Sequence, residues 1–547
     1  MGQNMRTFKG QKASSGIAIG PMLYFRRRRA DTSFNPICDV QAELDLVERA
    51  IREAVSQLDM IRSIALKKLG DEDANLFEVH SMMLTDPDYR ASITHFIVEE
   101  KANAEYAVSK TADVFAQMFL DMEDERMKVL ATDVWDVSAR VLDILHGSAS
   151  FMVCLQKPVI IAADELYPSE TVQLDTSLVL ALVTSNGSSN SHTAIFARNM
   201  GIPAVCALGK TIDESCNGKE AIVDGDGATL YIEPDRKTAE GWFKRRDEEA
   251  QKKAALATLV GLPGETLDGK KIKLLANIAG PADVDAALAN DAEGIGLVRS
   301  EFIFMGLTGF PSEEQQYVSY RKIVDKAKGR DVVIRTLDVG ADKQIDYFKL
   351  PKEENPALGL RALRVCLDRP EIFVTQLKAI YRAAAHGNVS ILLPMVSSLW
   401  ELREAKEIAA KVRSGLEAEK VPHSSQVPIG VMIETPAAAL ISDDLAREAD
   451  FFSIGTNDLI QYTLVVDRQN SALNRFTDTH HPAVLKLLKL TAENARRAGI
   501  PIGICGELAS DTELTKTFIQ IGIDSLSVSP PMILPLRKLI REMNAGG

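Results

Sequence analysis

The first strong pattern along the chain is helical and lies between about Cys38 and His146. Apolar positions recur there every three to four residues, as in AELDLVERAIREAVSQLDMIRSIALKKL, and glycine and proline are almost absent. This spacing places the apolar residues on one face of each helix, so the segment predicts a bundle of helical hairpins. Pro87, within TDPDYR, predicts a break between two of these helices because proline disrupts a helix interior.

The pattern then changes to short runs of β-branched residues that end in turn residues. KPVIIAA, SLVLALVT, IPAVCAL and EAIVDGDGATLYI indicate a compact α/β domain. The early run GIAIGPMLYF also predicts a strand, and we expect it to pair into the same sheet. Residues 1–30 and 148–235 would then form one α/β domain, with the helical segment 31–147 inserted into it.

A polar and charged helical stretch, residues 236–265, follows and is interpreted as a linker. Beyond it, eight short apolar runs alternate with helical patterns over residues 266–547. Eight β/α units in a segment of this length predict a closed (β/α)₈ TIM barrel, although strands of this size also suit an open parallel sheet. The predicted strands are KIKLLANI, EGIGLVRS, VVIRTLD, SILLPMV, PIGVMIET, DFFSIG, PIGICGE and SLSVS.

Composition restricts the function classes. The 547 residues contain 76 acidic and 63 basic side chains, and the net charge of −13 argues against a nucleic-acid binder. The apolar runs are far shorter than the ~20 residues of a membrane span, and the N-terminus lacks the apolar core of a signal peptide. The six cysteines are scattered without a CxxC motif, which predicts reduced thiols and a cytoplasmic location. Two partial phosphate-loop matches, at 264–270 and 209–211, lack required residues.

Polar residues lie where the predicted barrel strands end, and in such barrels the chemistry lies at those ends. Arg299, Arg335 and, shortly after the sixth strand, Arg468 predict a site for a phosphate or carboxylate. Guanidinium groups bind such oxygens with two parallel hydrogen bonds and keep their charge. The other polar residues at these ends are Asn277, Glu301, Asp338, Lys343, Glu434, Asn457, Asp458, Cys505, Glu507 and Ser529.

Glu434 and Asp458 are carboxylates among these arginines. Beside a phosphate site, an oxygen-rich pair predicts Mg²⁺, which takes one or two protein carboxylates and completes its shell with substrate oxygens and water. The alternative is that both carboxylates form structural salt bridges with the arginines. The pattern alone leaves these two interpretations open.

In the α/β domain, His192 lies on a glycine- and serine-rich loop directly before TAIFARNMG, which predicts the start of a helix. The backbone N–H groups of a helix N-terminus suit a phosphate carried on the histidine ring. A lone histidine is more often a structural residue, so the loop by itself does not decide between the two roles.

Several long motifs then carry a resemblance to a known family. In chain order they are SHTAIFAR, EGIGLVRSEFIFM, IRTLDVGADK, PKEENPALGLRALR, GVMIETPAA, FFSIGTNDLIQYTLVVDR and GICGELA. Over nearly its whole length the chain resembles Enzyme I of the phosphoenolpyruvate-dependent phosphotransferase system. The resemblance implies an α/β multidomain fold with a C-terminal barrel, a swivelling phosphohistidine domain and an inserted helical bundle.

The resemblance also implies an activity and residue roles. The chain would transfer the phosphoryl group of phosphoenolpyruvate to its own histidine and then to a histidine-containing phosphocarrier protein, releasing pyruvate. A homodimer formed through the barrel is implied as well. The implied residues are His192 as the phosphorylated histidine, Arg299, Arg335, Asn457, Asp458 and Arg468 for phosphoenolpyruvate, Glu434 and Asp458 for Mg²⁺, Cys505 as the proton donor, and Arg361 at the site margin.

The resemblance places the phosphocarrier on the helical insertion, where NLFEVHSMMLTDPDYR predicts a docking surface. Its expected apolar centre is Leu76, Phe77, Met82, Met83 and Leu84, and its expected acidic rim is Asp71, Glu72, Asp73, Asp86 and Asp88. The alternative is that the methionines belong to the helical core. The phosphohistidine loop departs from the family pattern at Ser188 and Asn190.

Parts of the sequence also suit two other functions. A pyruvate phosphate dikinase or phosphoenolpyruvate synthase shares the histidine and barrel modules, but it needs a nucleotide-binding domain for which this sequence offers no glycine-rich loop. A non-catalytic phosphoenolpyruvate sensor would not need an intact set of arginines, carboxylates, thiol and histidine. We therefore expect the phosphotransferase.

Overall fold

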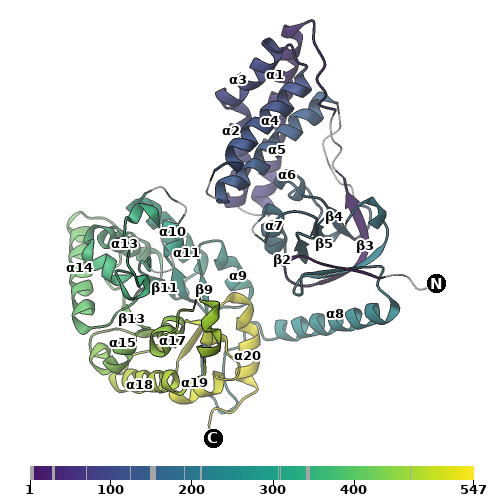
Figure 1. Ribbon diagram of the computed structural model, residues 1–547. Helices are drawn as coiled ribbons and strands as arrows, with labels where there is room; N and C mark the ends of the chain where they lie inside the picture. Colours follow the sequence, from purple (N-terminus) through teal and green to yellow (C-terminus); the bar gives the residue numbers. More distant parts are fainter. Residues whose placement is uncertain are drawn as a thin grey trace. The chain divides into compact units, whose positions relative to one another are not determined.

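The computed structural model describes residues 5–26, 31–68, 71–122, 125–147, 155–189, 191–209, 212–305, 307, 309–340, 345–468 and 470–546. The chain divides into two compact units, Met1–Gln251 and Lys252–Gly547, coloured purple to teal and teal to yellow in Figure 1. The boundary falls within helix α8 (Arg236–Ala257), a polar helix in the stretch interpreted as a linker. Asn190 and Lys343 lie outside the described residues.

The first unit contains a helical bundle made of α1 (Val40–Lys68), α2 (Asp71–Thr85), α3 (Pro87–Val98), α4 (Ala104–Leu120) and α5 (Glu125–Leu145). Its core is an apolar cluster in which Leu58, Phe77 and Ile97 are almost fully buried. The predicted break at Pro87 is confirmed, because α2 ends at Thr85 and α3 begins at the proline. Asp86 caps α3 by accepting hydrogen bonds from two backbone N–H groups, which satisfies donors that a helix start leaves unpaired.

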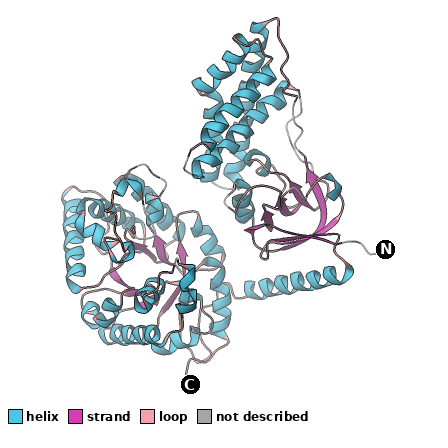
Figure 2. Cartoon of the chain, viewed as in Figure 1, coloured by secondary structure: helices cyan, strands magenta, loops and turns pink. Residues whose placement is uncertain are grey.

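The same unit contains a mixed sheet with the strand order β1-β8-β7-β3-β4-β5-β6-β2 (magenta in Figure 2). The prediction that the early strand joins the later sheet is confirmed, since β3 runs parallel to β4 and antiparallel to β7. The bundle is therefore an insertion between β3 and β4. The elements are β1 (Arg6–Lys9), β2 (Gln11–Ser14), β3 (Ile17–Phe25), β4 (Val159–Ala163), α6 (Pro168–Thr171), β5 (Val179–Thr184), α7 (His192–Met200), β6 (Ala204–Cys206), β7 (Glu220–Asp224) and β8 (Thr229–Ile232).

The second unit is a closed parallel barrel, so the open-sheet alternative is excluded. All eight predicted strands are present: β9 (Lys273–Ile278), β10 (Ile295–Arg299), β11 (Val332–Arg335), β12 (Val389–Leu393), β13 (Ile429–Ile433), β14 (Phe452–Ile454), β15 (Ile502–Ile504) and β16 (Ser525–Val528). The surrounding helices are α9 (Asp283–Ala289), α10 (Glu301–Phe304), α11 (Glu313–Ala327), α12 (Leu363–Asp368), α13 (Pro370–Ala383), α14 (Leu399–Ala418), α15 (Pro436–Leu440), α16 (Ser442–Ala446), α17 (Thr456–Leu464), α18 (Pro482–Ala498), α19 (Thr515–Ile521) and α20 (Ile533–Arg541).

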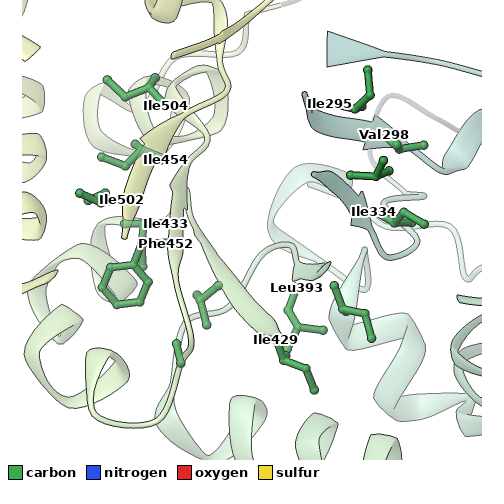
Figure 3. Packing of buried hydrophobic residues seen from close by; sticks show 14 of the residues in the cluster. Ile295, Val298, Ile334, Leu393, Ile429, Ile433, Phe452, Ile454, Ile502 and Ile504 are labelled. Atoms are coloured by element: carbon green, nitrogen blue, oxygen red, sulfur yellow. The ribbon is translucent and has the colours of Figure 1, made fainter. Parts of the chain in front are cut away.

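The barrel strands are apolar on both faces, which is typical of parallel strands covered by helices. Alternate residues such as Val298, Ile433 and Ile504 belong to the large cluster drawn in Figure 3. The residues between them, Leu297, Leu392 and Met432, form a second cluster together with Cys505. Because successive side chains of a strand point to opposite faces, this second cluster fills the barrel interior and places the thiol of Cys505 there.

Candidate active site

A cavity of about 430 Å³ lies at the carboxyl ends of the barrel strands and is called the barrel pocket below. The residues expected to bind substrate or metal or to donate the proton line this cavity, so the chemistry of widely separated motifs meets at one place: Arg299, Arg335, Glu434, Asn457, Asp458, Arg468 and Cys505. The lining residues are Leu297, Arg299, Glu301, Phe302, Arg335, Asp338, Met432, Glu434, Gly455, Asn457, Asp458, Arg468, Cys505, Gly506 and Glu507.

The arginines of the barrel pocket occupy two different environments. Arg299, at the end of β10, and Arg468 are exposed to solvent. Arg335, at the end of β11, is buried, and its guanidinium contacts Glu301 Oε1 at 2.6 Å and Asp338 Oδ2 at 3.0 Å. Burial disfavours its charge, but the surrounding carboxylates outweigh this effect and raise the pKa of Arg335. Arg335 is therefore a fixed cation in the pocket wall.

Arg361, expected at the site margin, does not line the pocket but contacts two carboxylates that do. Its side chain is 2% exposed, and its guanidinium contacts Asp338 Oδ1 at 3.0 Å and Asp458 Oδ1 at 3.2 Å. The phenol oxygen of Tyr462 accepts a further hydrogen bond at 3.1 Å from the same guanidinium. Arg361 thus lies behind the pocket wall, where it holds Asp338 and Asp458 in place.

Glu434, directly after β13, is 1% exposed and accepts a hydrogen bond of 2.6 Å from the backbone N–H of Met395. Burial and the neighbouring carboxylates of Asp458 and Asp338 raise the pKa of Glu434 to about 8. Gly455 allows this crowding, because a Cβ there would lie 2.6 Å from Glu434 Oε2. The neighbouring carboxylates, and not the burial, are what a positive charge at this edge of the pocket would compensate.

This arrangement fits Mg²⁺, because two carboxylates whose mutual repulsion a dication relieves are what this ion takes from a protein. No group of three or more histidine, cysteine, aspartate or glutamate side chains in the described ranges is arranged to hold a metal ion. A cation at Glu434 and Asp458 would therefore depend on substrate and water oxygens for the rest of its shell.

Asn457 and Cys505 complete the pocket floor and wall. Asn457, in the first turn of α17, exchanges two hydrogen bonds with Glu507: its amide donates to Oε1 at 3.1 Å and its oxygen accepts the backbone N–H at 2.9 Å. Cys505 is 3% exposed, and burial raises the pKa of its thiol to about 11. Asn277 supports this segment by donating to the Cys505 carbonyl at 2.9 Å. The thiol is consequently protonated at neutral pH.

His192 lies in the first unit, at the first residue of α7, so the predicted helix start is confirmed. Ser191 caps the helix by accepting a hydrogen bond from the N–H of Ala194. The His192 side chain is 29% exposed, and its Nε2 lies 3.6 Å from Asp133 Oδ1 of α5. One edge of the imidazole therefore faces the helical bundle.

Comparisons with known proteins match these parts in order. Family models described as the N-terminal, mobile and phosphoenolpyruvate-binding domains of PEP-utilising enzymes match residues 9–129, 155–227 and 253–545. Proteins named phosphoenolpyruvate-protein phosphotransferase from Priestia megaterium, Geobacillus stearothermophilus and Bacillus subtilis are 39%, 40% and 38% identical to the chain. The alignments cover 98%, 98% and 99% of this chain and 94%, 93% and 95% of the relatives.

The chain belongs to the phosphoenolpyruvate-protein phosphotransferase family. A solution structure titled Enzyme I (nEIt) is 31% identical and covers 44% of this chain and 99% of its own, with a TM-score of 0.39. Within the described ranges, no helix is both long and apolar enough to cross a bilayer.

In this phosphotransferase-family chain, the predicted docking surface is partly wrong. Phe77 and Leu84 are 1% and 0% exposed and belong to the bundle core, and Met83 packs against that core. Met82, at 59% exposed, remains on the surface, and Val79, at 42%, joins it three residues earlier on α2. Asp86 is the cap of α3, and the side chains of Asp71, Glu72 and Asp73 lie outside the description.

Sequence reasoning about this family member missed other groups beside the two sites. His80 and Asp133 lie behind His192, but they come from helices whose periodicity gives no sign that a polar side chain is buried. Glu301 and Asp338 were expected at the strand ends, because each follows an arginine there. Their role as partners of Arg335 was visible in the structure alone.

Proposed function

We propose that this chain transfers the phosphoryl group of phosphoenolpyruvate to His192 and from there to a histidine-containing phosphocarrier protein, releasing pyruvate. The observation that supports this most directly is the barrel pocket, where arginine, carboxylate, amide and thiol groups from separate strand ends surround one cavity. Membership of the phosphoenolpyruvate-protein phosphotransferase family gives the substrate and the reaction class.

The first step breaks the bond between phosphorus and the enol oxygen and forms one between phosphorus and a ring nitrogen of His192. The exposed Arg299 and Arg468, with Arg335 behind them, compensate the charge of the phosphate and carboxylate groups. Asn457 donates to a phosphate oxygen. Mg²⁺ held by Glu434 and Asp458 would supply further neutralisation of the phosphate oxygens.

The second product is the enolate of pyruvate, which needs a proton on carbon. We assign this proton to Cys505; the position of its thiol in the pocket wall and its raised pKa support the assignment. The thiolate that remains regains a proton from water. A phosphate bound to His192 would receive help from the N-terminal N–H groups of α7.

Transfer requires that the unit carrying His192 and the barrel pocket meet during the cycle, and we propose hinges at Glu233–Pro234 and Leu262–Pro263. Glu233 has a positive φ of 53°, which marks a turn just before α8.

We also propose a homodimer formed through the barrel and a cytoplasmic location. Sedimentation of the purified chain would measure whether it forms the dimer.

Incubation with phosphoenolpyruvate labelled in its phosphate tests the function. In the presence of Mg²⁺, the chain should gain an acid-labile, base-stable phosphate, because a phosphorylated histidine is hydrolysed in acid. His192→Ala should abolish the label, and addition of a phosphocarrier should remove it from the wild-type chain. Equal labelling of the variant would show that another residue is the nucleophile.

A further inference from the structure

A chain of buried polar side chains runs from His192 into the helical bundle. Asp133 Oδ1 lies 3.6 Å from His192 Nε2 and 3.3 Å from His80 Nε2, so one carboxylate oxygen stands between two imidazoles. His80 and Asp133 are 0% and 1% exposed. All three of these atoms are buried, and none has a hydrogen-bond partner among the described residues.

The series of buried polar side chains continues on the far side of His80. Its Nδ1 lies 4.0 Å from Asp136 Oδ2, one helical turn after Asp133 on α5. Asp136 is fixed in turn by the backbone N–H and the hydroxyl of Ser169, at 3.1 Å and 2.5 Å. Ser169 belongs to α6, and its neighbours Pro168 and Thr171 line a small cavity together with His192. This series of buried polar side chains therefore begins at His192 and ends beside the cavity that His192 lines.

Buried carboxylates and imidazoles are costly unless they form hydrogen bonds, so three such atoms facing one another indicate a joint function. A small rotation lets the Asp133 carboxylate accept a hydrogen bond from an N–H of each ring. A carboxylate beside one ring nitrogen fixes the tautomer and the orientation of an imidazole. The two ring nitrogens of His80 each face one carboxylate, that of Asp133 and that of Asp136.

We propose that Asp133, supported by His80, is a positioning residue that holds the ring of unphosphorylated His192 with a proton on Nε2. The proposal rests on the proposed function of His192 as the phosphoryl acceptor. A phosphoryl group on this ring brings additional negative charge toward Asp133. Asp133 therefore favours the unphosphorylated ring and promotes transfer of the phosphoryl group onward to the carrier.

The first test observes the ring directly in the full-length chain labelled with ¹⁵N-histidine, with His192→Ala used to assign the signal. In the wild-type protein, Nε2 of His192 should show the chemical shift of a protonated nitrogen. Asp133→Asn should change the tautomer ratio. Asp136→Asn is the matched control, because it removes an equally buried charge that contacts His80 and not His192. A wild-type ring with its proton on Nδ1 would overturn the proposal without any variant.

The second test measures the ratio of phosphoenolpyruvate to pyruvate at which half of His192 is phosphorylated. Asp133→Asn should shift this ratio toward the phosphorylated protein by about tenfold, equivalent to ~1.4 kcal/mol, since it removes a buried charge beside the ring. Asp136→Asn should shift it by less than about twofold at this greater separation. His80→Gln, which keeps one donor toward Asp133, should fall between the two.

The outcomes distinguish the proposed function of His192 from the positioning role of Asp133. If the wild-type chain gains no label at His192, the proposed function is wrong. If it is labelled but Asp133→Asn and Asp136→Asn have equal ring spectra and equal equilibria, the function stands and the positioning role is wrong. Circular dichroism of each variant verifies that the bundle is intact.

Discussion

Replacement of Cys505 by alanine removes the group that is proposed to protonate the enolate. Because burial raises the pKa of this thiol to about 11, fewer than about one in 10³ molecules carry a thiolate at pH 7.5. The acid is thus present in nearly every molecule. We expect Cys505→Ala to bind phosphoenolpyruvate normally and to form pyruvate about 10²–10⁴-fold more slowly, the usual contribution of a positioned acid.

The pH dependence follows from the same pKa. Pyruvate formation needs the protonated thiol and should not lose this acid until the pH approaches 11. The reverse reaction needs the thiolate as a base, so its rate should rise about tenfold per pH unit up to that value. The folded protein keeps this proton between pH 9 and 11 whereas the unfolded chain loses it. The corresponding stability is complete below pH 9 and decreases by about 3 kcal/mol as the pH rises through 11.

The assay is single-turnover release of pyruvate, with substrate binding measured separately by calorimetry. Cys366→Ala is the matched control, since this thiol is also fully buried in the barrel but lies outside the barrel pocket. It should lose roughly 1 kcal/mol of stability with an unchanged rate. Equal rates for the two variants would assign Cys505 to core packing, and a loss of pyruvate formation centred near pH 9 would contradict the raised pKa.

Three further changes test the other parts of the structure. Glu434→Gln should raise the Mg²⁺ concentration needed for His192 labelling at least tenfold; an unchanged requirement, titrated by isothermal calorimetry and by labelling, would leave Glu434 as a salt-bridge partner. Arg335→Met removes a buried cation that contacts both Glu301 and Asp338 and should destabilise the barrel by about 3–5 kcal/mol in urea unfolding. Met82→Asp should weaken phosphoryl transfer to the carrier while self-phosphorylation persists, and Met60→Asp, an equally exposed methionine on α1, is the control.

The sequence was sufficient for the architecture because both repeating patterns are strong. The 3.6-residue period placed the bundle, and eight separate apolar runs placed the barrel strands. The strand-end rule then brought Arg299, Glu434 and Cys505 to one pocket without knowledge of any contact. These patterns indicate which face of a helix or strand a residue occupies and how close the residue lies to the end of that element.

The burial of a side chain and the identity of its contact partners were not predictable from these patterns. Arg361 follows β11 by a long connection, so its motif gives no indication that it lies behind Asp338 and Asp458. Phe77 and Met82 share one apolar run, but the first faces the bundle core and the second faces solvent. His80 is a polar residue at a helical position that packing has enclosed completely. Each case depends on which neighbouring helix or strand covers the residue. The periodicity of apolar residues within one element does not contain that information.

The burial of two arginines determines how the barrel pocket treats an anion. Arg335 and Arg361 are already paired with Glu301, Asp338 and Asp458, so their charge mainly fixes the shape of the wall. Burial, and after it the carboxylates of Asp458 and Asp338, raise the pKa of Glu434, so an anionic Glu434 is not fully compensated by the arginines of the wall. Most of the compensation of an arriving phosphate would therefore come from exposed groups, Arg299 among them, and in the proposed function from Mg²⁺ at that edge, with Arg335 contributing from behind. The pocket thus combines a wall of paired buried charges with an opening where Arg299 and Arg468 remain exposed.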